Sequence, residues 1–310
     1  MRRLLPLLLL AACSATSKPA AAPAPTPSPS PSLTREGVEV TVGAKPCGVL
    51  AAGGFLWVSD YGDNDVARID PASHKVLGRA DTGAGPCGMA YGAGSVWVED
   101  FSGNAVTRVD ARTGRKQDEY EVGTGPYDVA FAEGAAWSTD YTDGTLTRID
   151  AATGRTTKVK VGGSPTGIAP SGGVLWVADG SKDVVKVDPR TSRVLGRVPV
   201  GIASTWTAFD DTHVWVSDTG TGQVAVLDSR TGALLGTAMT GGKPADGDAV
   251  KGVGWFPDRE TGEVIGVDAA GKVVGRHQTG LSDPFVLDSV GPTLWVGDFG
   301  GTGVQVLSVS

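Results

Sequence analysis

Short apolar and polar segments alternate along most of the chain, and one apolar segment recurs seven times. Each copy carries a tryptophan in a run such as Leu-Trp-Val-x-Asp, and these residues are Trp57, Trp97, Trp137, Trp176, Trp215, Trp255 and Trp295. The segments are rich in Val, Ile and Thr, and clusters of Gly, Asn, Asp and Ser separate them, which is typical of strands joined by tight turns. Four such segments fit into each repeat of about 40 residues, so each repeat predicts one blade of a β-propeller.

The count of segments predicts how the ring closes. In the first repeat the four strands are expected over residues 47–51, 55–60, 65–69 and 75–80. The last repeat begins at Pro284 and has room for only three strands before the chain ends. Residues 38–42 read as the missing fourth strand. The sequence therefore predicts an all-β, seven-bladed propeller of four-stranded blades, closed by the strand at 38–42, which leaves no radial gap with an open edge.

The repeated tryptophans are expected to be structural. Strands such as Leu56-Trp57-Val58 are almost continuously apolar, as expected when neighbouring blades cover both faces of each sheet. A feature that every blade shares is most simply a requirement of the blade. The seven tryptophans are therefore predicted to lie in the core, and residues that break the repeat are the better candidates for function.

Several short motifs carry a resemblance to known families. Gly-Pro-Tyr-Asp-Val-Ala at 125–130, Leu-Trp-Val-Ser-Asp-Tyr-Gly at 56–62 and Val-x-Arg-Ile-Asp at 66–70 resemble the YVTN-type propeller repeat of bacterial surface proteins. The repeat is also similar to that of virginiamycin B lyase-like propellers. The resemblance covers residues 36–310 and implies the fold more strongly than an activity, because one fold hosts many functions.

The lyase resemblance implies a histidine and an acidic residue that move protons at the channel, together with a divalent cation. His74, His213 and His277 occupy different positions in their repeats, so each is expected to be structural. The sequence has no Gly-x-Ser-x-Gly, His-Glu-x-x-His or phosphate-binding loop. The sequence therefore predicts no cofactor and no metal, and it favours a binding protein over an enzyme.

The first residues predict export. Arg2 and Arg3 precede an apolar stretch at 4–10, as in a secretion signal. Residues 10–13, Leu-Ala-Ala-Cys, resemble the bacterial lipobox, which implies a signal peptide over 1–12 and a lipid on Cys13. The alternative is a plain secretory signal with an incidental cysteine.

Residues 13–35 are dominated by Pro, Ala, Ser and Thr, and this composition predicts a disordered tether ahead of a propeller at 36–310. The lipid would anchor the chain in the cell envelope, on the outer face of the cytoplasmic membrane or on an outer membrane. The net charge of −7 offers no basic surface for nucleic acid. A monomer is expected, with a protein, peptide or glycan of the envelope as partner.

Two sets of aspartates recur with the repeat. One set stands three residues after each repeated tryptophan: Asp60, Asp100, Asp140, Asp179, Asp218, Asp258 and Asp298. The other opens the outer hairpins: Asp70, Asp110, Asp150, Asp188, Asp228 and Asp268. A ring of carboxylates could hold a metal, but the simpler interpretation is that each Asp accepts hydrogen bonds from backbone N–H groups of its own turn.

Cys47 and Cys87 occupy the same position in adjacent blades, each in Pro-Cys-Gly. With Cys13 lipidated they are the two remaining thiols in an oxidising compartment. Neighbouring inner strands can bring their Cα atoms to the separation that a disulfide needs, so a Cys47–Cys87 bridge is predicted. Two free buried thiols are the alternative.

The start of the innermost strand differs between blades and is expected to crowd the mouth of the central channel. Tyr127, Trp206 and Phe285 stand there as aromatic candidates for ligand binding, and Asp128 and Asp246 as acceptors and weak catalytic candidates. Trp206 is the one tryptophan outside the repeat. It either plugs the channel or provides a stacking platform.

A second departure from symmetry follows the first set of aspartates. The blades numbered seven, one, two and three carry Phe299, Tyr61, Phe101 and Tyr141 there, near acidic residues such as Glu99. These blades are contiguous in a closed ring, so the four rings would form an aromatic crescent on the face of the channel mouth. The crescent is either a recognition surface or a set of rings that pack on neighbouring loops.

The sequence supports two hypotheses for the function. The first is an extracytoplasmic, lipid-anchored propeller that recognises a ligand or partner on the face of the channel mouth. The alternative is a small-molecule lyase or hydrolase similar to virginiamycin B lyase, with acid and base residues such as Asp128 and Asp246 at the channel.

Overall fold

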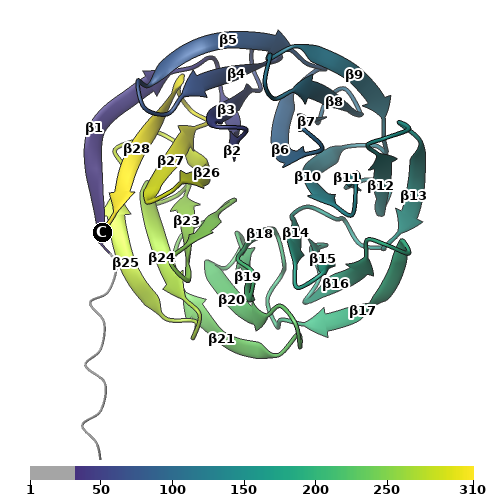
Figure 1. Cartoon of the computed structure of the whole chain (residues 1–310). Helices are drawn as coiled ribbons and strands as arrows, with labels where there is room; N and C mark the ends of the chain where they lie inside the picture. The colour runs from purple at the N-terminus through teal and green to yellow at the C-terminus, as the bar shows by residue number, and fades with distance from the viewer. Residues whose placement is uncertain (1–31) are drawn as a thin grey trace, which may run out of the picture. The chain divides into compact units, whose positions relative to one another are not determined.

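The computed structural model describes residues 32–310, and these form a ring of seven four-stranded antiparallel sheets (Figure 1). The predicted signal peptide, Cys13 and most of the predicted tether lie outside the described residues. No helix in the described part is long and apolar enough to cross a membrane. The predicted all-β seven-bladed propeller is confirmed.

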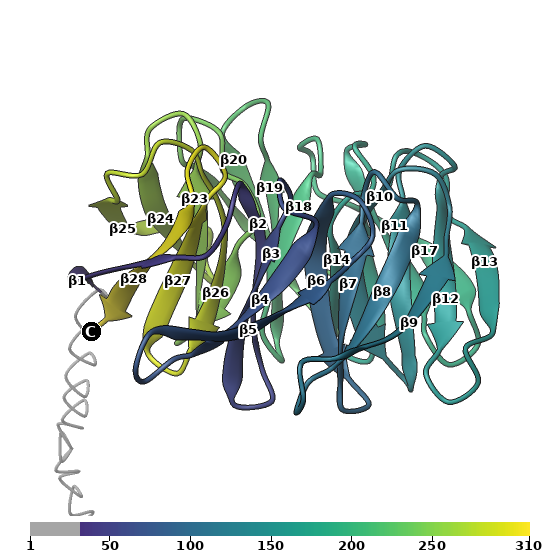
Figure 2. The same cartoon turned by 90° about the horizontal axis from the view of Figure 1, so that it is seen from above.

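Each blade runs from an inner strand at the channel to an outer strand at the rim (Figures 1 and 2). The inner strands are β2 (Pro46–Ala52), β6 (Pro86–Gly92), β10 (Pro126–Ala132), β14 (Ile168–Ser171), β18 (Trp206–Phe209), β22 (Asp248–Val250) and β26 (Pro284–Val290). The second strands are β3 (Phe55–Asp60), β7 (Ser95–Asp100), β11 (Ala135–Asp140), β15 (Val174–Ala178), β19 (His213–Asp218), β23 (Val253–Asp258) and β27 (Thr293–Asp298).

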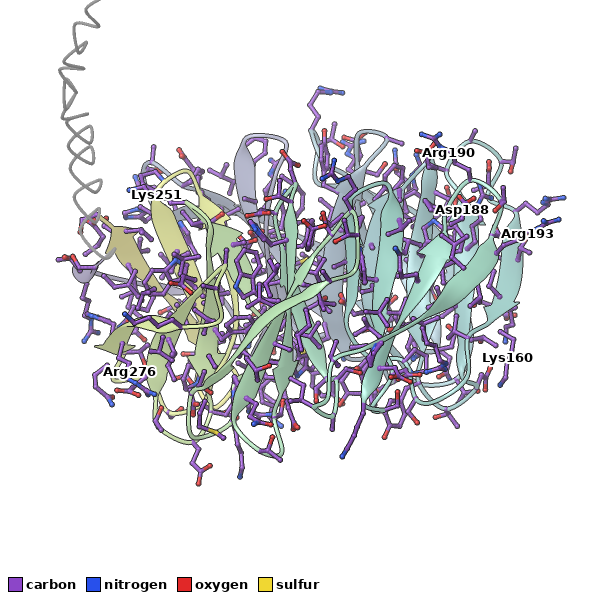
Figure 3. The ribbon with its side chains drawn as sticks, turned by 90° about the horizontal axis from the view of Figure 1, so that it is seen from below. Lys160, Asp188, Arg190, Arg193, Lys251 and Arg276 are labelled. Carbon is purple, nitrogen blue, oxygen red and sulfur yellow. A yellow bond between two sulfur atoms is a disulfide. The ribbon has the colours of Figure 1, made fainter. Side chains whose placement is uncertain are left out.

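The third and outer strands complete the blades. The third strands are β4 (Asp65–Asp70), β8 (Ala105–Asp110), β12 (Thr145–Asp150), β16 (Asp183–Asp188), β20 (Gln223–Asp228), β24 (Glu263–Asp268) and β28 (Gly303–Val309). The outer strands are β5 (Lys75–Asp81), β9 (Lys116–Glu121), β13 (Thr156–Lys160), β17 (Arg193–Pro199), β21 (Leu234–Met239), β25 (Val273–Gln278) and β1 (Leu33–Thr41). The outer strands are largely exposed, and charged side chains such as Arg193 and Arg276 project from them (Figure 3).

The ring closes as predicted, through the first strand. β1 pairs antiparallel with β28, so the seventh sheet has the order β1-β28-β27-β26. β1 is longer than the predicted strand at 38–42, and its register shifts between Arg35 and Glu39. The first and last strands of the described residues therefore share one blade, and the third strand of blade 7 is covered along its edge.

The repeated tryptophans hold neighbouring blades together. All seven are at most 1% exposed, so their predicted place in the core is confirmed. The apolar clusters bridge adjacent sheets; one cluster, for example, joins Trp97 and Val106 of blade 2 to Val129 and Ile149 of blade 3. Burial of one tryptophan is worth roughly 4–6 kcal/mol gross, at 150–250 Å² and about 25 cal/mol/Å². No single sheet supplies this burial, because each tryptophan packs on the next blade.

The outer-hairpin aspartates behave as predicted. Each accepts a backbone N–H bond from the residue two positions later in its own turn, at 2.8–3.3 Å. For the other set the prediction is only partly right. Asp179, Asp218 and Asp258 accept bonds from N–H groups of their own turns. Four find partners elsewhere, on an arginine, a threonine or the loop that leads into the blade: Asp60, Asp100, Asp140 and Asp298. All seven are buried, so they support the blade ends.

The disulfide between Cys47 and Cys87 is present and joins β2 of blade 1 to β6 of blade 2, with a Cα–Cα distance of 4.7 Å. Gly48 permits this approach. A Cβ at residue 48 would lie 2.0 Å from the Cys87 carbonyl oxygen, closer than any side chain can come. The two free thiols considered as the alternative are excluded, and the bridge is consistent with an exported protein.

Removal of the disulfide should lower the free energy of unfolding. For Cys47→Ala combined with Cys87→Ala we expect a loss of about 2–4 kcal/mol, because the bridge closes a loop with a sequence separation of 40 residues. Urea unfolding followed by tryptophan fluorescence measures this change. Dithiothreitol should destabilise the wild-type chain by a similar amount and leave the double variant unaffected. A wild-type midpoint that does not respond to reductant would contradict the prediction.

Candidate functional site

Seven aromatic side chains gather in one cavity at the start of the inner strands. The cavity has a volume of about 400 Å³. All the aromatic candidates from the sequence line it: Tyr61, Phe101, Tyr127, Tyr141, Trp206, Phe285 and Phe299. We call it the aromatic cavity. The structure thus brings the predicted channel-mouth residues and the predicted crescent into a single site.

The seven rings form one connected network. Ring centroids of successive neighbours lie 5.3–5.8 Å apart, in edge-to-face or tilted arrangements that aromatic pairs prefer. Trp206 is central, because its ring lies 5.3 Å from Tyr127 and 5.5 Å from Phe285. Tyr141 is 42% exposed, whereas Trp206 is only 6% exposed. The network therefore runs from the solvent to the hub.

Trp206 lies at the hub of the ring. Its low exposure and its contacts with rings on both sides mean that it fills the hub, as a plug does. It also lines the aromatic cavity, so a ligand there would meet its ring.

The polar groups of the aromatic cavity are few and carry no negative charge. Three threonines line it, together with Arg259. The Arg259 guanidinium lies 4.7 Å from the Phe285 ring centroid and 5.8 Å from that of Phe299. Asp283 accepts from Arg259 at both carboxylate oxygens, 2.7 Å from Nε and 2.5 Å from the second nitrogen. This pairing holds the guanidinium plane in place and largely neutralises its charge.

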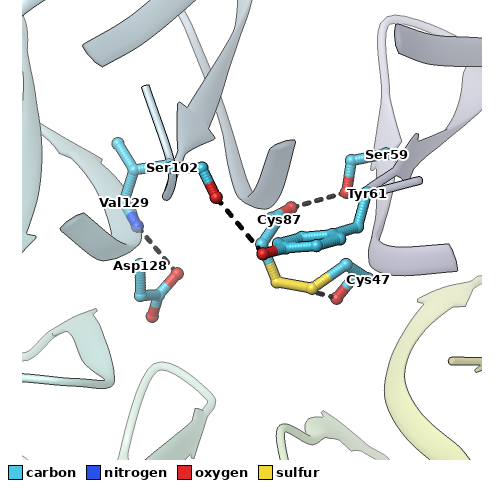
Figure 4. The surroundings of a disulfide bond; sticks show 7 residues. All are labelled: Cys47, Ser59, Tyr61, Cys87, Ser102, Asp128 and Val129. Carbon is cyan, nitrogen blue, oxygen red and sulfur yellow. Dashed lines mark hydrogen bonds between the residues drawn. A yellow bond between two sulfur atoms is a disulfide. The ribbon is translucent and has the colours of Figure 1, made fainter. Parts of the chain in front are cut away.

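The disulfide belongs to the wall of the aromatic cavity, since both cysteines line it. Figure 4 shows the Tyr61 ring near the bridge, with its hydroxyl 3.2 Å from the Ser102 hydroxyl of the next blade. The Ser59 hydroxyl donates to the Cys87 carbonyl at 2.6 Å. These links between blades 1 and 2 fix the side of the cavity that carries Tyr61.

Asp128 and Asp246 do not lie in the aromatic cavity, contrary to the expectation that they would join the aromatic residues. They line a second cavity of about 350 Å³ together with Asp248 and Asp288. We call it the acidic cavity, defined by these four carboxyls. Most of its lining comes from further along the inner strands than the lining of the aromatic cavity, for example Tyr91, Phe131 and Asp288, so it lies toward the opposite face of the ring. Consecutive residues of an inner strand point in different directions, so Tyr127 and Asp128 serve different cavities.

Burial raises the pKa values of aspartates that line the acidic cavity. It raises the pKa of Asp128 to about 7, against the opposing effect of N–H bonds from Ile168 and Val129. Burial, and then the charge of Asp128, raise the pKa of Asp246 well above its ordinary value. The pKa of Asp288 is raised in the same way by burial and by the nearby Asp248. No lysine, arginine or histidine lines the cavity to offset these effects.

Glu99 is also placed differently from the expectation. It is not beside the crescent at the surface but fully buried. Burial, followed by the charges of Asp100 and Asp128, raises its pKa well above the usual range. Because it stands on the second strand, the neighbouring blade covers it, which the pattern of one blade cannot reveal.

The described residues show where the three histidines lie and whether potential metal ligands cluster. His74, His213 and His277 line neither cavity. Within residues 32–310 no group of three or more His, Cys, Asp or Glu side chains is arranged to hold a metal ion. The acid–base side chains that line the two cavities are aspartates and tyrosines.

Sequence reasoning missed several residues at the far ends of the inner strands. The aromatic side chains Tyr91, Phe131 and Phe209 line the acidic cavity and occupy equivalent positions in blades 2, 3 and 5. Asp288 was missed as well; it occupies in blade 7 the position that Asp248, an acceptor candidate beside Asp246 in the sequence, occupies in blade 6. The blade-by-blade comparison that identified the aromatic cavity would have found them if applied four and five positions along each inner strand.

Solved structures resemble this chain in fold, whereas no protein-family model and no curated protein matches it. A streptogramin B lyase structure is 14% identical, with a TM-score of 0.78, over 90% of this chain and 98% of that chain. The hydrazine synthase of Kuenenia stuttgartiensis is 14% identical, with a TM-score of 0.71, over 88% and 98%. The computationally designed Ika8 protein is 15% identical, with a TM-score of 0.64, over 87% and 98%. At these identities the likeness shows the propeller fold alone.

Stability should fall as the pH rises from about 5 to 8. The native state holds protons on carboxyls with raised pKa values, such as the buried Glu99 and the half-buried Asp128, Asp246 and Asp288, whereas the unfolded chain releases these protons near pH 4. Protonation therefore stabilises the native state below the raised values, and this contribution is lost as the pH passes through them. We expect the melting temperature to fall by several degrees, at roughly 2–4 °C for each kcal/mol lost.

Asp246→Asn should flatten this profile, because the variant side chain stays neutral at every pH. Asp81→Asn, on the exposed outer strand β5, removes the same charge without burial and should leave the profile unchanged. Melting curves by circular dichroism in buffers matched for ionic strength measure both. A wild-type melting temperature that rises or stays level between pH 5 and 8 would be evidence against the raised pKa values.

Proposed function

We propose that this chain is an extracytoplasmic binding protein, held at a membrane by a lipid on Cys13, that recognises a cell-envelope partner through the aromatic cavity. One observation supports this proposal above all. Seven aromatic side chains that depart from the repeat line a single cavity. Each blade already buries its own repeated tryptophan, and the aromatic residues of the cavity are additions that the repeat does not require in every blade.

The lining of the aromatic cavity favours a neutral ligand with flat apolar faces. Aromatic rings bind such faces by stacking, and the threonine hydroxyls can bond to polar edges of the ligand. Arg259 is compensated by Asp283, so the cavity offers little net charge to an ion. A glycan ring or an apolar side chain of a protein or peptide matches this chemistry. The net charge of −7 disfavours nucleic acid.

A second candidate function is a lyase or hydrolase that acts on a small molecule at the acidic cavity. Asp128 favours it, because a carboxyl with a pKa of about 7 is suited to acid–base catalysis near neutral pH. The fold likeness to a streptogramin B lyase makes streptogramin B the first compound to test. Consumption by the wild-type chain, followed by chromatography and lost in Asp128→Asn, would favour this alternative.

Tyr61→Ala combined with Phe101→Ala should abolish binding through the aromatic cavity. The two variants delete stacking surface from adjacent blades, and both side chains are only partly buried, so the fold should persist. Immobilised wild-type and variant chains would be incubated with separate envelope protein and glycan fractions, and the retained species identified by mass spectrometry.

The matched control is Leu77→Ala combined with Leu195→Ala, two exposed apolar side chains on outer strands. It should retain the same species as the wild type. Species retained equally by all three chains would show that the aromatic cavity does not recognise them, and the proposed function would then fail.

A further inference from the structure

The acidic cavity holds carboxyls that no basic side chain of its lining compensates. Four carboxyls line it, from Asp128 in blade 3, Asp246 and Asp248 in blade 6, and Asp288 in blade 7. None of the four takes part in an ion pair within residues 32–310, although several carboxyls elsewhere in the ring do. Ionisation of carboxyls that are crowded together without a cation is unfavourable. Further observations indicate which kind of ligand would relieve this.

A second observation concerns Glu99. It stands two residues after the repeated tryptophan, as Ser59 and Thr139 do in the neighbouring blades. The hydroxyls of Ser59 and Thr139 reach carbonyl groups on the channel side of the following blade, Cys87 and Thr166. Glu99 holds the same position, and the charge of Asp128 is among the causes that raise its pKa. Its carboxyl is fully buried, so a fifth acid lies within electrostatic reach of this cavity.

A third observation is the aromatic lining. Tyr91, Phe131 and Phe209 line the acidic cavity, and Tyr91 and Phe209 are 45% and 37% exposed. Large aromatic side chains that stay exposed beside carboxyls are a combination that recognises organic cations, because the face of a ring attracts positive charge. The aromatic cavity on the other face lacks carboxyls, so the two cavities differ in the charge that they select.

We propose that the acidic cavity is a second ligand site, which binds an organic cation. The ammonium group lies among the carboxyls of Asp128, Asp246, Asp248 and Asp288, and the apolar body of the ligand contacts Tyr91, Phe131 and Phe209. An inorganic ion matches the site less well, since no three acidic groups of residues 32–310 are arranged as metal ligands. Such an ion would also make no use of the aromatic lining.

Binding should be coupled to proton release. Carboxyls that hold a proton in the free protein give it up to the solvent as the ammonium group arrives, leaving a carboxylate paired with the cation. The titratable groups that face the site are Asp128 on β10, Asp246 and Asp248 at β22, Asp288 on β26, Glu99 on β7 and Tyr91 on β6. Because no basic side chain lines the cavity, protons should leave and none should be taken up.

Calorimetric titration of the purified protein with three probes that share a phenethyl group and differ in charge tests the proposal. The probes are phenethylammonium, neutral 2-phenylethanol and anionic 3-phenylpropionate, each at pH 7.5 in two buffers of different ionisation enthalpy. We expect phenethylammonium to bind with a Kd of about 1 mM or below and with net proton release, and the other two to show no saturation. Equal binding of 2-phenylethanol, or no binding of phenethylammonium, would overturn the proposal.

Substitutions in the acidic cavity test whether phenethylammonium binds there. Asp246→Asn should weaken phenethylammonium binding roughly tenfold through loss of a charge-assisted contact. Phe209→Ala should weaken it about threefold through loss of a cation–π contact. Phe209 is exposed, so this variant keeps the test valid even if Asp246→Asn unfolds. Asp81→Asn on the outer strand should bind as the wild type does. Unchanged affinity in Phe209→Ala, or saturable Mg²⁺ binding that phenethylammonium does not displace, would contradict an organic-cation site.

Discussion

The structure depends on the burial of one tryptophan per blade between neighbouring sheets. Trp97, for example, is completely buried, and its apolar cluster includes residues of the next blade. No blade can satisfy this requirement alone, so the sheets must follow one another until the last meets the first. β1 completes that last sheet, which is why a strand from the start of the chain pairs with β28. Closure then fixes the seven inner strands around the channel.

This scaffold separates two surfaces of different chemistry. The starts of the inner strands carry the aromatic network around Trp206, with one compensated arginine. The far ends carry carboxyls from three blades beside aromatic side chains. Both sets depart from the sevenfold repeat, and both lie where loops and strand ends are free of the packing between blades. The disulfide between blades 1 and 2 fixes part of the aromatic wall, so it belongs to the site as well as to the fold.

Much of this arrangement could be predicted, because residues at equivalent positions of the repeat occupy equivalent places in the ring. The spacing of the tryptophans predicted the fold, and the equal positions of Cys47 and Cys87 predicted their bridge. The same register placed Tyr61 and Trp206 on one face. It could not show that Tyr127 and Asp128 serve opposite cavities, since that depends on the direction of each side chain. Nor could it show the burial of Glu99, which depends on contact with the next blade.

The central claim is that residues which break the repeat at the two ends of the inner strands form the binding surfaces. Crystals of residues 32–310 soaked with a library of small fragments would test it directly, because fragments report where a protein surface binds ligands. We predict that bound fragments cluster in the aromatic and acidic cavities, with cationic fragments confined to the acidic one. Fragments found mainly along the outer strands or between blades, with both cavities empty, would contradict the claim.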